Sequence, residues 1–177
     1  MTMTSGLRKF ALTAHVACSV GFLGAVAGFL ALAIAGLSSR DAQVVRAAYL
    51  AMELTTWSVV VPLSVASLLT GIVQALGTPW GLFRHYWVLV KLLLTVVTTS
   101  VLLLQTEPIS HIAAAAAEKV LSSADLRALR SSLVFPHAAG GLLLLLVTTT
   151  LSVYKPRGMT RYGWRKKHGQ HALPNGA

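Results

Sequence analysis

The chain has 177 residues, enough for one domain, and 55% of them are hydrophobic whereas only 11% are charged. A soluble domain usually carries about 25% charged residues, so this composition excludes an ordinary soluble globular protein. The net charge of +10 does not indicate a nucleic-acid partner, because six of the fifteen lysines and arginines lie between Lys155 and Lys167, beside an apolar segment. A basic cluster in that position is typical of a membrane surface.

The first apolar block, residues 10–37, follows Arg8 and Lys9. Its length exceeds the apolar region of a signal peptide, about 7–15 residues, so we expect an uncleaved transmembrane helix. Gly24 and Gly28 are four residues apart and share one helix face, which allows another helix to approach closely. We expect this face to pack within the bundle rather than to form a dimer.

The second block, residues 45–76, contains Pro62, which removes one backbone hydrogen bond and is expected to kink the helix. Polar and small residues recur along one face at spacings of three and four. These residues are Glu53, Trp57, Val60, Ser64, Ser67 and Gly71. In a membrane helix such a face normally points into the bundle, so we expect these side chains to be interior.

The third block, residues 86–104, is expected to end shortly before Pro108. Lys91 lies one to two turns inside this block, and we expect its ammonium to reach back to the membrane interface. Residues 105–132 then form an external loop on the membrane surface. Within this loop we predict two short helices, at 113–121 and 125–129.

The fourth block, residues 133–154, completes an all-α, four-helix transmembrane bundle over residues 1–155, followed by a basic tail over residues 156–177. Four crossings place both termini on one side. That side carries more lysine and arginine than the other, so the positive-inside rule predicts that both termini are cytoplasmic. The residues expected to contact anionic lipid headgroups there are Lys155, Arg157, Arg161, Arg165, Lys166 and Lys167.

Two stretches carry a resemblance. One runs from Ser67 to Trp87 and contains Gly77-Thr78-Pro79-Trp80-Gly81, and the other is Leu151–Trp164, which contains Tyr154-Lys155-Pro156-Arg157-Gly158. Together they resemble an uncharacterised family of bacterial four-helix integral membrane proteins, over most of the chain from Leu7 to Lys167 and least well over 106–131. Such proteins loosely resemble membrane proteins of the copper-resistance protein D type. The resemblance implies a four-helix fold in a bacterial cytoplasmic (inner) membrane and no particular activity.

Histidines are the first candidates for chemistry, because an ionisable side chain inside a membrane suggests a functional site. His15 lies about 9 Å from the cytoplasmic boundary and His137 about 7–8 Å from the outer one, a difference of about 13 Å in depth that prevents them from sharing one haem or metal ion. A bis-histidine site of His15 and His85 would need helix tilt to close an offset of roughly 7–8 Å. The candidate cofactor-binding residues are therefore His15, His85 and His137, with haem b as the candidate cofactor.

Glu53 is a second candidate, because its depth is within about 3 Å of that of His137. A carboxylate and an imidazole at one level can share a proton, coordinate a metal ion or hold a quinone headgroup. Tyr49 lies one turn from Glu53 and is expected to complete a proton or ligand site, and His111 from the external loop is expected to complete a metal site of His137, Glu53 and His111. The competing interpretation is that Arg46 neutralises Glu53.

Three functional hypotheses remain open. The first is a redox-linked accessory membrane protein that binds haem, quinone or a metal ion within the bundle. The second is a small proton-coupled permease or transporter subunit, with Glu53 and His137 as its site. The third is a ligand-free structural or assembly subunit that contacts another membrane protein or a second copy of the chain. No phosphate-binding loop or soluble hydrolase motif is present in the sequence.

Overall fold

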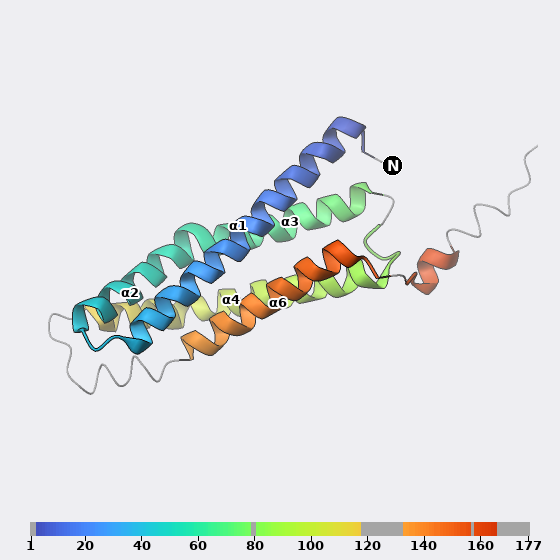
Figure 1. Ribbon diagram of the computed structural model, residues 1–177. Coiled ribbons are helices and arrows are strands. Elements are labelled where there is room, and N and C mark those ends of the chain that lie inside the picture. The colour runs from blue at the N-terminus through green and yellow to red at the C-terminus, as the bar shows by residue number, and fades with distance from the viewer. Residues whose placement is uncertain (1–2, 79–80, 118–132, 157, 166–177) are drawn as a thin grey trace, which may run out of the picture.

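Long apolar helices form a bundle that accounts for most of the described residues (Figure 1). The computed structural model describes residues 3–78, 81–117, 133–156 and 158–165. In chain order, the named elements are α1 (Ser5–Ser38), α2 (Ala42–Thr55), the π-helical turn η1 (Thr56–Val60), α3 (Val61–Gly77), α4 (Tyr86–Ala117) and α6 (Val134–Tyr154).

Four segments of this bundle are long and apolar enough to cross a membrane: α1, the continuous segment from α2 to α3, α4 and α6. Their outer faces carry large apolar side chains, among them Phe10, Leu93 and Leu104, whose exposed fractions are 71%, 64% and 76%. A continuous apolar surface of this kind is suited to lipid and not to water. The predicted all-α, four-helix membrane fold is therefore confirmed.

The second span changes helix type just before Pro62. Residues Thr56–Val60 form a π-helical turn, and the backbone N–H of Val61 donates to the carbonyl of Thr56, five residues earlier. Proline has no N–H and its ring crowds the carbonyl of the preceding turn, so a wider turn accommodates it without ending the helix. The disturbance expected at Pro62 is present as this inserted residue.

The inserted residue rotates the face of α2 that meets the bundle. Downstream of the turn, Ser64 and Ser67 are buried, as predicted. The buried residues within and upstream of the turn are Val60, Thr56, Met52, Tyr49, Ala48 and Val45. The predicted face kept α-helical spacing through the turn and passed instead through Trp57 and Glu53. It is wrong for Trp57, which is 53% exposed, and Glu53 is only half-buried.

Helix α4 does not end before Pro108 but continues through it to Ala117. A proline inside a helix costs roughly 3 kcal/mol, which packing offsets here: Ile109, Ala113 and Ala116 recur every three or four residues and are buried. Ile109 and Ala116 belong to one core with residues of α1 and α2. The expected loop start at residue 105 is therefore wrong, residues 113–117 belong to α4, and the rest of the predicted external loop up to residue 132 lies outside the described residues.

The Gly24 and Gly28 face of α1 does not pack against any other described part of the chain. Both glycines are exposed, and a Cβ at either position would meet no atom within 4 Å among the described residues. The expectation of packing within the bundle is therefore wrong. Helix α1 instead contacts the bundle through its bulkier side, on which Phe22 and Val26 are buried.

The residues after α6 fold back onto the turn between α3 and α4. The backbone N–H of Thr160 donates to the carbonyl of Arg84 at 2.9 Å, and its hydroxyl donates to the carbonyl of Phe83 at 2.6 Å. The same hydroxyl accepts from the N–H of Gly163 at 3.1 Å, which caps the helical turn at residues 161–165. The beginning of the tail and the α3–α4 turn therefore lie at the same end of the bundle (Figure 1).

Replacing Thr160 with alanine removes both the cap and the contact with Phe83. Loss of a helix cap costs about 1 kcal/mol, so we expect amide hydrogen exchange at Gly163 and Trp164 to speed up about fivefold. Thr150→Ala is the matched control, because the hydroxyl of Thr150 is exposed and bonds only within α6, to Leu146. Equal exchange rates in the two variants would contradict the capping role of Thr160.

Candidate functional site

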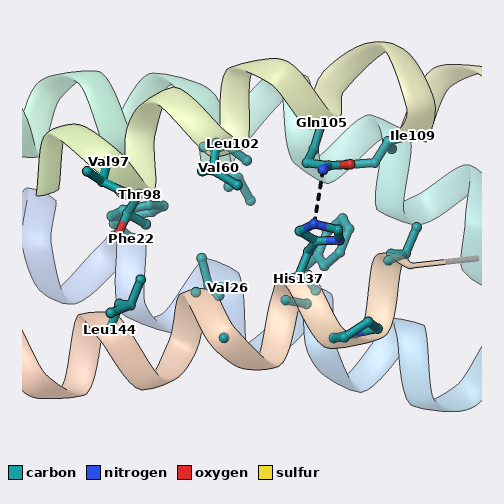
Figure 2. A pocket seen from close by; sticks show the side chains of 17 residues that line it. Phe22, Val26, Val60, Val97, Thr98, Leu102, Gln105, Ile109, His137 and Leu144 are labelled. Atoms are coloured by element: carbon teal, nitrogen blue, oxygen red, sulfur yellow. Dashed lines mark hydrogen bonds between the residues drawn. The ribbon is translucent and has the colours of Figure 1, made fainter. Parts of the chain in front are cut away.

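A cavity of about 260 Å³ lies between α4 and α6, with side chains of α1 and η1 on its inner side (Figure 2). The inner side is apolar, formed by residues such as Phe22, Val26 and Val60. Among the lining residues, the polar side chains are those of Thr98, Gln105 and His137. Thr98 donates its hydroxyl to Leu94 of its own helix at 2.8 Å, so the polar chemistry of the cavity comes from Gln105 and His137.

His137 and Gln105 form a hydrogen-bonded pair between α6 and α4 (Figure 2). The Nδ1 atom of His137 is 2.6 Å from the carbonyl oxygen of Leu133, and its Nε2 atom is 3.2 Å from the amide nitrogen of Gln105. A carbonyl only accepts, so the hydrogen bonds assign the proton to Nδ1 and leave Nε2 to accept from the amide. The ring is therefore held as the neutral Nδ1–H tautomer.

Two glycines of α6 leave the cavity open beside His137. Gly140 and Gly141 both line it, and a Cβ at either position would meet no atom within 4 Å in the described part of the chain. A glycine in a helix is less favourable than alanine by about 1 kcal/mol, and here no close helix contact requires one. What these glycines provide is space next to the His137 ring.

The cavity opens onto the outer surface of the bundle. Several of its lining residues are also exposed, including His137 and Gly140 on α6 and, on α4, Val97 and Val101, which are 44% and 41% exposed. The neighbouring surface is the apolar one described above. A ligand therefore has a lateral path between α4 and α6 from the lipid side.

The three histidines predicted as cofactor ligands occupy three separate environments. His137 lines the cavity near the start of α6. His15 lies on α1, where its Nδ1 atom is 3.2 Å from the hydroxyl of Thr70 on α3. His85 lies in the turn before α4, with its backbone bridged to Met159. His15 and His137 are thus near opposite ends of the bundle, as predicted from their depths.

Glu53, Tyr49 and His111 are not brought to His137. Glu53 does not line the cavity, and its carboxylate makes no hydrogen bond or ion pair with another described residue. Tyr49 is buried in the core formed by α1, α2 and α4, against Gly36, and His111 is exposed on the extension of α4. No group of three or more His, Cys, Asp or Glu side chains that could hold a metal ion occurs within the described ranges. The proposed pairing of Glu53 with His137 is therefore not formed there.

Arg46, the predicted neutraliser of Glu53, has a different partner. Its Nε atom donates to the carbonyl of Ala116 at 2.9 Å, at the last turn of α4. A cation at this position compensates the unpaired carbonyls at a helix C-terminus. Arg46 thus stabilises the extension of α4 that the sequence did not predict.

Of the six basic residues expected at the lipid surface, three fall in the described residues. Lys155, Arg161 and Arg165 are exposed there. Arg157, Lys166 and Lys167 lie outside the described residues. Lys155 also ends α6, in a left-handed backbone conformation with φ of 44°.

Gln105 is the site residue that sequence reasoning missed. It was assigned to the external loop, because Pro108 was expected to end the helix before it. The available signal was a single amide at the end of the apolar run of α4, at a level where His137 enters the bundle from α6. An amide in that setting normally finds a partner on a neighbouring helix.

Comparison with protein families, curated proteins and solved structures found no match to this chain. The resemblance noted in the sequence therefore remains a resemblance. What can be inferred about function depends on the geometry of the chain itself.

The substitution Gly140→Ala tests whether Gly140 leaves open space beside His137, and Gly71→Ala, at a packed glycine, is the comparison. A Cβ at Gly140 meets nothing, so we expect this substitution to stabilise the protein by up to about 1 kcal/mol. A Cβ at Gly71 would lie 3.0 Å from Cε1 of His15, so the same change there should lose most or all of that gain. Thermal unfolding in detergent measures both, and a Tm for Gly140→Ala below that of Gly71→Ala would contradict the assignment.

Proposed function

We propose that this four-helix membrane protein binds the headgroup of a membrane quinone in the cavity between α4 and α6. The observation that carries the proposal is the His137–Gln105 pair, the polar element of an otherwise apolar cavity that opens toward lipid. A few placed polar groups in an apolar cleft are typical of small-molecule sites. This favours the quinone version of the redox-linked accessory hypothesis.

The chemistry of the pair fits a carbonyl ligand. A quinone oxygen accepts hydrogen bonds, and the amide of Gln105 has two N–H groups, of which His137 occupies one. The bond to His137 fixes the orientation of the amide, and its second N–H can donate to the quinone oxygen. The apolar inner side, formed by residues such as Phe22 and Val60, suits a flat ring, and the lateral opening leaves a path for an isoprenoid chain into the bilayer.

The other hypotheses have less support from the geometry. A bis-histidine haem needs two imidazoles facing one site, whereas the cavity is lined by one histidine, His137. A proton-coupled site built on Glu53 and His137 needs them in contact, whereas Glu53 does not line the cavity that His137 lines. A ligand-free subunit has no need for Gly140 and Gly141 to keep a cavity open.

The quinone proposal is tested with protein reconstituted in lipid nanodiscs and a photoactivatable azidoquinone. We expect light-dependent labelling of peptides from 97–109 and 134–144, competed by unlabelled quinone. His137→Phe removes a partner that positions Gln105 and should weaken binding about fivefold, the effect of about 1 kcal/mol for one hydrogen bond. Gly141→Leu fills the cavity and should abolish labelling.

His111→Phe is the control for that experiment, because it removes an exposed histidine of α4 that lies outside the cavity lining. Its labelling should equal that of the original protein. Labelling that is unchanged in Gly141→Leu would exclude this cavity as the site. A haem Soret band in the purified protein after dithionite reduction would mean that the bound ligand is haem and not a quinone.

We also infer that the protein is a bacterial inner-membrane protein with both termini in the cytoplasm. The support is the lysine and arginine distribution, together with the contact of Thr160 with the α3–α4 turn, which gathers the basic tail and that turn at one end. Green fluorescent protein fused after Ala177 should fluoresce, and alkaline phosphatase fused after Lys119 should be active. The opposite pair of results would reverse the orientation.

A further inference from the structure

The ammonium of Lys91 lies where the start of α4 meets the end of α6. It donates to the hydroxyl of Ser152 on α6 and lies 5.7 Å from the centre of the Trp87 ring. Ser152 in turn donates to the carbonyl of Thr148 at 2.9 Å, which orients its oxygen toward Lys91. The ammonium is thus held in a half-buried position by α6.

The charges around this ammonium are positive. Lys155, at the end of α6, lies close enough for its charge to act on Lys91, and the charge of Lys91 acts on His15. No ion pair to Lys91 is found among the residues that the structure describes. Two nearby cations repel one another, and an anion between them would remove the repulsion.

Among the described residues, no acidic side chain lies at this end of the bundle. The five acidic residues of the chain are Asp41, Glu53, Glu107, Glu118 and Asp125. Asp41 caps α2 at the opposite end of the bundle. Glu53 lies in the half of the Ala42–Gly77 span nearer to that end, and Glu107 lies in the corresponding half of α4. Glu118 and Asp125 follow α4 in the sequence and precede α6, outside the described residues. The compensating anion for Lys91 therefore comes from outside the described chain.

The depth of Lys91 identifies the kind of anion. Lys91 is five residues from the start of α4, about 7–8 Å along its axis, and Ser152 is two residues from the end of α6. This is the level at which a span leaves the hydrocarbon and meets lipid headgroups, and Trp87 beside it is a typical interfacial residue. Basic pockets between helices at this level bind phosphorylated headgroups.

We propose that the surface where the start of α4 meets the end of α6 is a specific site for the phosphate of an anionic phospholipid, bound by Lys91 with Lys155 as the second cation. Ser152 positions Lys91, and the Trp87 ring lies against the part of the lipid next to the phosphate. This site is separate from the cavity, whose α4 residues begin at Val97, and it does not depend on a quinone ligand.

The test is native mass spectrometry of the protein in non-ionic detergent with phosphatidylglycerol or, in parallel, phosphatidylcholine. We expect one phosphatidylglycerol molecule per chain to be retained, and no phosphatidylcholine at the same concentration. Lys91→Met keeps the length of the side chain without its charge, and should lower affinity for phosphatidylglycerol at least fivefold. Lys91→Arg keeps the charge and should retain the lipid.

The matched control is Lys9→Met, because Lys9 is an exposed lysine near the start of α1, at the same end of the bundle. It should retain the lipid as the original protein does. Ser152→Ala provides a second measurement if Lys91→Met does not fold, and should weaken retention because it removes the hydroxyl that holds Lys91.

Two outcomes would overturn the proposal. Equal loss of lipid in Lys91→Met and Lys9→Met would mean that only the overall positive charge matters. Displacement of phosphatidylglycerol from the original protein by millimolar inorganic phosphate, at constant ionic strength, would mean that the site takes a free phosphate and not a lipid.

Discussion

The π-helical turn before Pro62 is the feature on which the interior of this bundle depends. In a membrane the backbone polar groups of a span must find partners within the protein, so the chain cannot open at a proline as a soluble loop would. It inserts one residue, and the N–H of Val61 bonds to Thr56 instead. This insertion turns Tyr49 and Met52 inward, where they pack with the extension of α4, and it places Val60 against the cavity.

The membrane spans could be predicted from the sequence, because an apolar block of about 20 residues is stable in a bilayer only as a helix with its own backbone hydrogen bonds. The side-chain partners could not be predicted, since they join distant positions: Gln105 with His137, and Lys91 with Ser152. The error at Glu53 has a definite cause. Periodicity was followed through η1 as if it were α-helical, and one added residue moves every upstream side chain by about 100°.

The end of α4 was mispredicted for a different reason. Local preference at Pro108 favours a helix end, whereas the burial of Ile109 and Ala116 against α1 and α2 is a tertiary effect that a local rule does not include. Because Gln105 fell in the predicted loop, it was not considered as a partner of His137. The depth argument for His15 and His137 was simpler, because it needed only the helical rise and the block boundaries.

The lateral opening beside His137 has a consequence for how any ligand reaches the protein. A molecule that enters between α4 and α6 comes from the bilayer, so its occupancy follows its mole fraction in lipid and not its aqueous concentration. Lipid partitioning concentrates apolar molecules, gaining about 0.8 kcal/mol for each buried CH₂ group. A site with modest intrinsic affinity can then remain filled, and the apolar chain of the ligand contributes to selectivity before His137 is reached.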